Sequence, residues 1–473
     1  MADQVRHEAG TLPGAQAMRL PADMLLVASV IFCAALFGIM TRPVGFLAAF
    51  WPANAVLLGL MIREPRLASF GGWIAAFAGY VAADLVTGGT LRMTLWLTAA
   101  NLTEALTGYV LFRALAEDHR RMRWPQSIVV LFAVCCCAAA MSAFVGAGVS
   151  TAYFGRDFAT SLELWFSTEL ANTTVMLPVM LAAPRLADIR LPRRIDLSAQ
   201  GLRRATPAIA LAASILLGSL IGGPGSFAFP VPALLWCAVS YSLFATASLT
   251  LCFTIWGMVI ITGAFADLPA DTDLVAWGKS IRLALALIAL APLAVASINA
   301  NRNQLLKRLK DMVEHDEMTG ALTRATFLER SERHLSQDGT AAVLMLDIDR
   351  FKSVNDRHGH AAGDVALVAF AAAVRAALRP GDLFGRLGGE EFAVFLPRAT
   401  QAEAQALAGR IRRAVEERPV DIGDGSRLTI TVSIGLALQA TIARPSLDAL
   451  LATADAALYQ AKAGGRNRVE TAA

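Results

Sequence analysis

Hydrophobic residues are concentrated before Asn299, where they form long runs broken by charges, prolines and glycine clusters. A transmembrane helix needs about 20 mostly apolar residues, so runs of this length predict membrane spans. The run 229–266 is too long for one crossing, and we expect it to turn between Thr246 and Thr250. The predicted spans are 22–41, 45–62, 67–88, 93–114, 127–150, 162–183, 207–222, 229–247, 248–266 and 280–298.

After residue 298 the pattern changes, because charged and apolar residues mix as they do in a water-soluble domain. Apolar runs predict a strand over 340–348, two strands around a Gly-Gly turn over 384–396, and an alternating strand over 428–438. Helical spacing predicts helices over 363–379, 402–418 and 447–463. Strands and helices that alternate in this way are typical of a mixed α/β domain with a split βαβ sheet.

The segment between the two halves has a pattern of its own. From Ile298 to His315 the sequence is polar but keeps Leu306, Leu309 and Val313 at spacings of three and four. This spacing predicts an amphipathic or coiled-coil helix that continues the last span. It fits a dimerising, signal-transmitting stalk, and it also fits a plain surface helix packed on the soluble domain.

Composition supports a membrane protein. Of the 473 residues, 56% are hydrophobic and only 17% are charged, which is far from the soluble average. The formal net charge of +4 is small, and the arginines lie largely in loops between apolar runs, so the basic balance does not indicate nucleic-acid binding. The six cysteines all lie in apolar runs without a metal-ligand spacing, and we expect them to be packing residues.

Arginine clusters predict the orientation, because short cytoplasmic loops are enriched in Lys and Arg. The loops after the second, fourth and sixth spans carry Arg63, Arg66, Arg120, Arg121, Arg123, Arg185, Arg190, Arg193, Arg194, Arg203 and Arg204. The opposite loops carry Arg42, Arg92, Arg156, Asp157, Asp267, Asp271 and Asp273. The first set lies on the predicted cytoplasmic side, and an even number of spans puts both termini there.

This topology divides the chain into four predicted segments. They are a cytosolic tail over 1–21, an integral membrane domain over 22–298 with eight to ten transmembrane helices, a coiled-coil or signalling-helix linker over 299–315, and a soluble α/β domain over 316–473. The tail has no cleavable signal pattern. A transporter with a regulatory tail is a competing hypothesis, and the scattered charges and missing internal repeat oppose it.

Polar residues inside the predicted spans are costly unless they are paired or hydrated. Such residues mark either a ligand or signal site, or helix-to-helix hydrogen bonds and places near the interface. The residues are Asp84, Asn101, Glu104, Glu169 and Asn172. The element Trp51-Pro52-Ala53-Asn54 also interrupts an apolar run and predicts a broken helix.

With these elements, the segment from Phe50 through Leu115 and the later Glu169-Leu170-Ala171-Asn172 resemble the first class of bacterial membrane-associated sensor (MASE) domains. The resemblance implies an integral sensory module for an unidentified signal. Such modules usually have fewer spans than the ten predicted from the pattern. It also implies a multi-pass protein of the bacterial inner membrane, with the lipid bilayer as its surroundings and the catalytic domain in the cytosol.

Acidic residues end or interrupt the predicted strands of the soluble half. Asp347 and Asp349 end the first strand, and Glu390 and Glu391 lie at the Gly-Gly turn. Strand residues two apart share a face, and carboxylates that converge from two strands suit a hard cation such as magnesium. Paired glycines let a substrate approach the backbone. A solvated turn would have the same local pattern.

Five motifs in order over 314–471 resemble the GGDEF family of diguanylate cyclases, and this ensemble favours a catalytic site. The motifs are Asp316-Glu317-Met318-Thr319-Gly320 with Leu322, Arg324 and Phe327; Asp347-Ile348-Asp349-Arg350-Phe351-Lys352 with Asn355, His358, His360, Gly363 and Asp364; Gly388-Gly389-Glu390-Glu391-Phe392; Thr431-Val432-Ser433-Ile434-Gly435; and Ala454, Asp455, Ala457, Leu458 and Tyr459 with Lys462 and Gly465-Arg466-Asn467-Arg468. Met318 and Thr323 depart from the usual residues.

The resemblance implies a nucleotidyl-cyclase palm fold and a role for each matching position. Asp347, the Ile348 carbonyl and Glu391 would hold Mg²⁺ or Mn²⁺, and Glu390 would assist deprotonation of the attacking ribose 3′-hydroxyl. The other implied positions are Asn355 and Asp364 at the guanine, Phe351 and Lys352 near the nucleotide, and Lys462 and Arg466 as a phosphate clamp. A carboxylate at Asp364 accepts from guanine N–H groups, which favours GTP over ATP.

The family's reaction needs two copies of the domain. Each binds one GTP, and each 3′-hydroxyl attacks the other's α-phosphate, so the resemblance implies a homodimer that makes cyclic di-GMP and two pyrophosphates. Arg379 and Asp382, five residues or more before the glycine pair, are similar to the family's RxxD inhibitory site for product, with Arg386 in support. A degenerate domain that only binds a nucleotide or cyclic di-GMP is the alternative.

Overall fold

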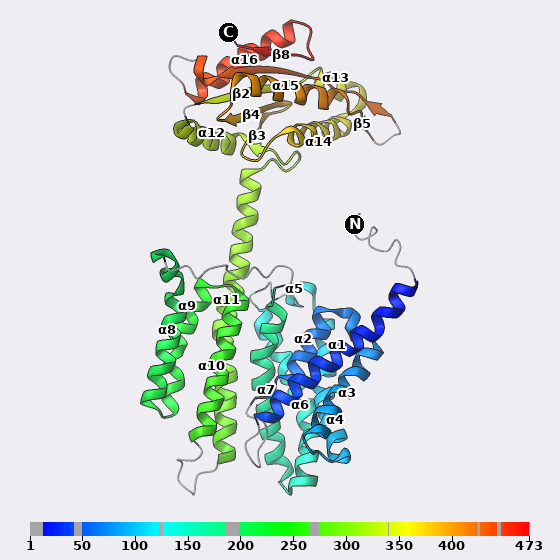
Figure 1. Cartoon of the computed structure of the whole chain (residues 1–473), viewed down its shortest axis with the longest axis vertical. Coiled ribbons are helices and arrows are strands. Elements are labelled where there is room, and N and C mark those ends of the chain that lie inside the picture. The colour runs from blue at the N-terminus through cyan, green and yellow to red at the C-terminus, as the bar shows by residue number, and fades with distance from the viewer. Residues whose placement is uncertain are drawn as a thin grey trace. The chain divides into compact units, whose positions relative to one another are not determined.

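The computed structural model describes residues 13–41, 50–120, 122, 124, 126–184, 198–264, 274–338, 340–422, 426–441 and 446–472. The chain divides into two compact units, Met1–Asn303 and Gln304–Ala473, which we call the helical unit and the catalytic unit (Figure 1). The helix α11 begins in the first unit and ends in the second.

In the described residues of the helical unit, the regular elements are all helices (Figure 1). Several begin at a side chain that caps the first turn: Ser69 accepts from the Gly72 N–H, Asp157 from Thr160, and Ser198 from Gly201. The elements are α1 Pro13–Met40, α2 Ala53–Arg63, η1 Pro65–Ala68, α3 Phe70–Val86, α4 Leu91–Ala114, α5 Glu117–Arg120, α6 Ser127–Phe154, α7 Phe158–Ala182, α8 Ala199–Ile221, η3 Pro224–Ala228, α9 Pro230–Ser240, α10 Leu243–Ala264 and α11 Leu274–Glu314.

Each predicted span overlaps a helix in the part of the chain that the structure describes, but one predicted break between spans is wrong. The break in the run 229–266 lies at Tyr241 and Ser242, and Thr246 and Thr250 lie inside α10. Tyr241 is extended, and the Ser242 hydroxyl accepts from the Ala245 N–H at 3.3 Å, as a residue preceding a helix does. The capping serine therefore sets this break.

Not every helix is long enough to span a bilayer. By length and composition alone, five described helices could cross a membrane: Leu20–Met40, Ser127–Phe154, Ala199–Ile221, Ala276–Glu314 and His360–Ala377. The last of these packs Phe370 into the core of the catalytic unit. The helices α2 and α9 have 11 residues each, about 16 Å at 1.5 Å per residue. The count of eight to ten crossings stays a prediction.

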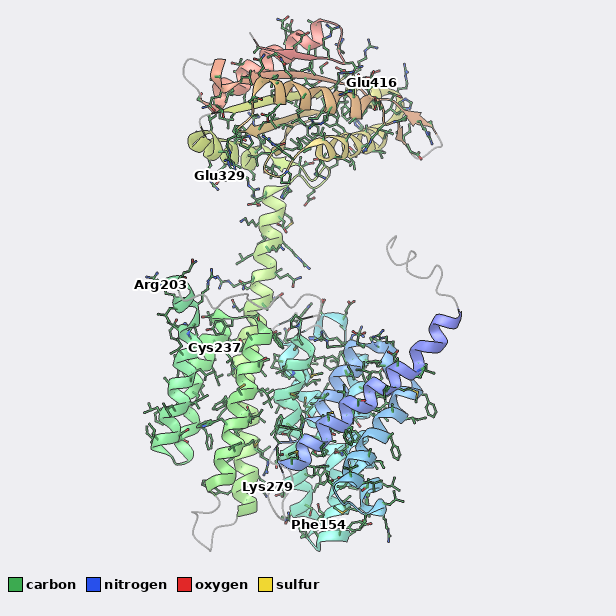
Figure 2. All side chains as sticks on the ribbon, in the orientation of Figure 1. Phe154, Arg203, Cys237, Lys279, Glu329 and Glu416 are labelled. Atoms are coloured by element: carbon green, nitrogen blue, oxygen red, sulfur yellow. The ribbon has the colours of Figure 1, made fainter. Side chains whose placement is uncertain are left out.

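The two ends of the helical unit differ in the residues that mark them. Figure 2 shows Arg203 at one end, and Phe154 and Lys279 at the opposite end. Which end faces the cytoplasm stays a prediction. Ten of the loop residues used for that prediction lie outside the described residues: Arg42, Arg121, Arg123, Arg185, Arg190, Arg193, Arg194, Asp267, Asp271 and Asp273.

The catalytic unit is built on a six-stranded mixed sheet of order β1-β3-β4-β2-β7-β8. Its four inner strands are antiparallel and follow the chain as βαββαβ, which confirms the predicted split βαβ fold. The strands are β1 Leu322–Thr323, β2 Ala341–Ile348, β3 Leu383–Gly388, β4 Glu391–Pro397, β7 Val432–Leu438 and β8 Val469–Thr471, with β5 Val420–Asp421 and β6 Arg427–Leu428 as a separate pair.

Helices cover both faces of this sheet, so β2 is buried along its whole length. On one face Phe370 of α14 and Ile411 of α15 pack against Phe392, and on the other Phe327 of α12 and Leu458 of α16 pack against Phe395. The helices are α12 Arg324–Asp338, α13 Phe351–His358, α14 His360–Ala377, α15 Gln401–Glu416, η4 Gln439–Thr441 and α16 Leu447–Ala463. The sequence pattern did not predict α12 or α13.

Candidate active site

The ends of two adjacent strands bring the predicted metal ligands together. Asp347 near the end of β2 pairs in register with Glu391 at the start of β4. Residues opposite each other on antiparallel strands have Cβ atoms about 5 Å apart, so the two carboxylates are neighbours. Ile348 follows at the last position of β2, and its side chain is fully buried. Metal binding by these residues stays a prediction.

A lysine side chain already contacts one carboxylate of this pair. The Lys462 ammonium of α16 lies 2.8 Å from an Asp347 carboxylate oxygen. Burial nevertheless raises the pKa of Asp347 above its usual value, against the hydrogen bond and charge of Lys462 and the charge of Arg466, which lower it. Burial and the nearby Asp347 charge also raise the pKa of Glu390. The ionised forms of these carboxylates would therefore be stabilised by further positive charge.

The predicted metal-binding residues supply only part of the oxygen ligands of a divalent ion, and water or substrate would have to supply the others. Among the described residues, no three His, Cys, Asp or Glu side chains gather into a metal-binding group. Two carboxylates and a backbone carbonyl are the oxygen ligands that magnesium accepts, and it usually takes further ligands from water and substrate phosphates. Asp347, the Ile348 carbonyl and Glu391 match this donor set.

The glycine turn leaves space beside the carboxylates. Gly389 has φ of +39°, which favours glycine. Gly388 has no such requirement, and a Cβ added there would meet nothing within 4 Å. The backbone conformation therefore does not require glycine at position 388. The missing side chain leaves open space there, as close approach of a substrate requires.

Arg386 on β3 holds this turn in place. Its Nε and Nη2 donate to the Gly389 carbonyl at 2.9 and 2.7 Å, and its Nη1 donates to the Asp316 carboxylate at 3.1 and 3.2 Å. A β-bulge at Leu387 separates the Arg386–Phe392 pair from the Gly388–Glu391 pair. Partial burial acts to raise the pKa of Asp316, but hydrogen bonds from Thr319 and the Arg386 charge lower it overall.

A second acidic residue fixes the loop that carries Arg466. The Asp349 carboxylate accepts from the Thr431 hydroxyl at 2.7 Å, the Ser433 hydroxyl at 2.6 Å and the Asn467 N–H at 3.0 Å. Both Arg466 and Asn467 have positive φ, 66° and 47°. The strained loop after α16 is thus tied to the end of β2, next to Asp347.

The predicted guanine-binding positions lie on α13 and α14. The Asn355 side-chain oxygen is buried without a hydrogen-bond partner among the described residues. Gly363 lies against it, since a Cβ there would come within 1.9 Å of that oxygen. Asp364 and Lys352 are exposed, whereas Phe351 is buried in the core. An unsatisfied buried oxygen fits a position that awaits a ligand donor.

A cavity of about 350 Å³ adjoins this region, between α13, the approach to β7 and the loop after α16. Of the predicted site residues, Arg466 lines it; Asn355 and Asp364 do not. The structure therefore does not bring all predicted nucleotide contacts to one cavity.

The predicted inhibitory residues form a closed turn. The Arg379 Nε lies 3.1 Å from Asp382, whose side chain is 2% exposed, and Arg379 also donates to the Pro397 carbonyl at 3.0 Å. Arg386 contacts Asp316 and Gly389 instead of this turn. A role for the three residues in product binding stays a prediction.

Comparison with known proteins agrees with this site. Residues 313–468 match the family described as diguanylate cyclase, GGDEF domain. The chain is 32% identical over 441 residues to DgcF, a probable diguanylate cyclase of Escherichia coli O157:H7, covering 92% of this chain and 91% of that protein. DgcF of E. coli K12 is 34% identical over 315 residues, which are 65% of this chain and 96% of that protein.

A solved structure is also similar. The coiled coil and GGDEF domain of DgcB from Caulobacter crescentus, in complex with c-di-GMP, has 30% sequence identity and a TM-score of 0.36. The match covers 38% of this chain and 98% of that one.

The chain belongs to the GGDEF family of diguanylate cyclases, since a relative above 30% identity aligns over nearly its full length. It is a diguanylate cyclase, an enzyme that makes cyclic di-GMP. The alternative of a degenerate, non-catalytic domain is therefore set aside.

Two features of the site were not predicted from sequence. Asp316 was recognised as a motif residue without a role, and Asp349 only as one of the acidic residues suited to a cation. The structure shows that Asp316 holds Arg386 at the glycine turn and that Asp349 holds the Arg466 loop. The partners of Asp349 lie more than 80 positions away along the chain, so only the Thr-x-Ser spacing of Thr431 and Ser433 could have signalled the contact.

Proposed function

We propose that the catalytic unit condenses two GTP molecules into cyclic di-GMP and two pyrophosphates, with one GTP held by each of two facing copies. The observation that carries this proposal is the register pairing of Asp347 with Glu391 beside the open Gly388 position. Two copies are needed because each ribose 3′-hydroxyl attacks the α-phosphate held by the other.

In this proposal Asp347, the Ile348 carbonyl and Glu391 hold Mg²⁺ or Mn²⁺. When bound, the ion supplies Lewis-acid neutralisation of phosphate charge. Lys462 and Arg466 add positive charge at the triphosphate, and both already act on Asp347. Such fixed charges stabilise the negative charge that develops as pyrophosphate leaves.

Glu390 assists removal of the proton from the attacking 3′-hydroxyl. Its raised pKa supports this role, because a base whose pKa is closer to neutral accepts a proton more readily. Asn355 and Asp364 bind the guanine edge, and the unpartnered Asn355 oxygen supports this assignment. Phe351 and Lys352 lie along the nucleotide.

Regulation is proposed at two places. Product binds at Arg379 and Asp382, with Arg386 in support, and opens their ion pair to do so. A signal reaches the enzyme through the helical unit, a multi-pass MASE-type sensor of the bacterial inner membrane. The stalk of α11 carries exposed apolar side chains, Leu306 at 50%, Leu309 at 54% and Val313 at 70%, which support pairing with a second copy.

The test is GTP turnover by the purified full chain in detergent, with Mg²⁺ or Mn²⁺ present. We expect wild type to form cyclic di-GMP and pyrophosphate in a 1:2 ratio, and Glu391→Ala to lose at least a hundredfold in rate. The control is Thr453→Ala on α16, where the half-buried hydroxyl donates to the Ala449 carbonyl of the same helix, and it should keep wild-type turnover. Equal product from wild type and Glu391→Ala would contradict the assignment of the site.

A further inference from the structure

A second polar site lies in the helical unit, where α2, α3, α4 and α7 meet. Six polar or aromatic side chains from these elements, together with Trp51 just before α2, form what we call the buried cluster. Its two acidic members are almost fully enclosed, with Glu104 1% and Glu169 4% exposed. The cluster consists of Trp51, Asn54, Tyr80, Asn101, Glu104, Glu169 and Thr173.

Asn54 is the centre of the buried cluster. Its amide nitrogen lies 2.6 Å from Glu104, 3.2 Å from the Asn101 oxygen and 3.3 Å from Glu169. Its oxygen accepts from the Tyr80 hydroxyl at 2.7 Å and from the Trp51 indole at 3.1 Å. The oxygen is therefore satisfied, and the nitrogen has more acceptors than it can serve.

The buried cluster is short of positive charge. An amide nitrogen carries two hydrogens, but three acceptors surround that of Asn54. Thr173 donates to the second oxygen of Glu104. Among the described residues, no Lys, Arg or His forms a salt bridge with Glu104 or Glu169. Two carboxylates out of contact with water are costly without a compensating charge.

An unpartnered side chain adds a second observation. Neither the nitrogen nor the oxygen of the Asn172 amide has a partner among the described residues, although the residue is 1% exposed. It lies on α7 between Glu169 and Thr173, on the helix face that carries both. A fully buried amide with both groups unsatisfied is rare in proteins and calls for a ligand.

We propose that the buried cluster binds one hard metal cation through the carboxylates of Glu104 and Glu169, with amide oxygen from Asn101 or Asn172. The donors are all oxygen, which is the preference of Na⁺, Mg²⁺ and Ca²⁺. Two carboxylates favour a divalent ion by charge balance. Such a site has fewer than three acidic side chains, so it differs from the acid-rich groups that are absent among the described residues.

The chain offers a readout for the helical unit alone. All eight tryptophans lie between positions 51 and 277, and none lies in the catalytic unit. Trp51 donates to Asn54, so its emission reports on the buried cluster. The experiment uses the full chain in detergent with Glu391→Ala throughout, which weakens metal binding in the catalytic unit, and follows tryptophan fluorescence.

The chelator-stripped protein is titrated with CaCl₂, MgCl₂ and NaCl at constant ionic strength. We expect a saturable change with at least one divalent ion, and at least a tenfold higher half-saturation concentration for Glu104→Gln and Glu169→Gln. The matched control is Glu163→Gln, also on α7, which pairs with the Lys279 ammonium at the exposed end of the unit (Figure 2). Its titration should equal that of wild type.

Three outcomes would overturn the proposal. They are no saturable response to any of the three ions, a response that both glutamine variants retain unchanged, and a response to pH alone, which would mean a shared proton only. If the glutamine variants do not fold, equilibrium dialysis of the Glu391→Ala chain decides the question. One ion bound per chain supports the site, and less than a tenth of an ion refutes it.

Discussion

At the residue scale, two glycines of the catalytic sheet have opposite surroundings. A Cβ at Gly388 would meet nothing within 4 Å, whereas a Cβ at Gly435 would lie 2.0 Å from the Ala454 carbonyl and 2.2 Å from the Leu458 nitrogen. Gly435 lets α16 pack closely on β7, and Gly388 leaves room beside the carboxylates. Both glycines belong to sequence motifs, and the sequence alone does not distinguish their surroundings.

We therefore expect Gly388→Ala to leave the melting temperature of the catalytic unit within about 2 °C of wild type but to lower turnover at least tenfold, because the new methyl group occupies substrate space. Gly435→Ala should unfold the sheet, so that the melting transition of the catalytic unit and GTP turnover are both lost. Differential scanning calorimetry and GTP turnover of the two variants test this contrast. An active Gly388→Ala enzyme would contradict the role of the turn.

Asp316 supports a prediction of pH dependence. Its pKa is lowered in the folded protein, so its stabilising contribution is present above the unfolded value of about 3.9 and is lost as pH falls through the lower folded value. Asp316→Asn should weaken the Arg386 contact by about 1 kcal/mol at pH 7. The difference from wild type should shrink toward pH 3.

Hydrogen exchange of peptides that cover 383–392 in the full chain measures this effect. The wild-type advantage in protection should be present at pH 7 and should shrink as pH falls below the unfolded value of about 3.9. Glu403→Gln, at the start of α15, serves as a control, because its capping partner Thr400 lies elsewhere in the unit. A difference for Asp316→Asn that is independent of pH would contradict the assignment.

At the element scale, some boundaries were predictable from sequence and others were not. The helix α16 occupies the predicted range, because Ser446 caps its start and a pair of glycines follows its end. The helix α12 was missed because its composition is polar, and α13 because it has only eight residues after a left-handed Arg350. The short strands β1 and β8 depend on pairing with distant strands.

The stalk, the part of α11 that carries Leu306 and Leu309, supports a prediction about dimer formation. Leu306→Lys with Leu309→Lys should abolish dimer formation and lower turnover at least tenfold, because it places charge on the exposed apolar side of the helix. Lys307→Ala with Arg308→Ala is the matched control on the polar side. Analytical ultracentrifugation and GTP turnover measure both pairs, and an active monomer would contradict the need for a dimer.

At the scale of the whole molecule, the division into a helical and a catalytic unit follows from the change in hydrophobic pattern. The sequence predicted the sheet through its strands and the site through its motifs. It could not predict how Arg386 and Asp349 connect distant segments, because these contacts depend on tertiary packing rather than local spacing.

A prediction for the whole chain concerns which end of the helical unit faces the cytoplasm. Arg203 and Phe154 lie at opposite ends of the helical unit (Figure 2). If arginine-rich loops face the cytoplasm, Phe154→Cys should react with an impermeant thiol reagent on intact cells, and Arg203→Cys should react only after permeabilisation. The parent chain, whose six cysteines lie in apolar runs, gives the background. The reverse labelling would contradict the predicted orientation.

The β-bulge at Leu387 limits the sequence changes that the β3–β4 hairpin can accept in evolution. Two residues on β3 face one on β4 there, so the bulge acts as a spacer that sets on which face of the sheet the following residues project. Exchange of Leu387 for another apolar residue should preserve turnover, whereas its deletion should abolish it. Evolution can therefore exchange one apolar residue for another at position 387, but it cannot change the number of residues in the hairpin.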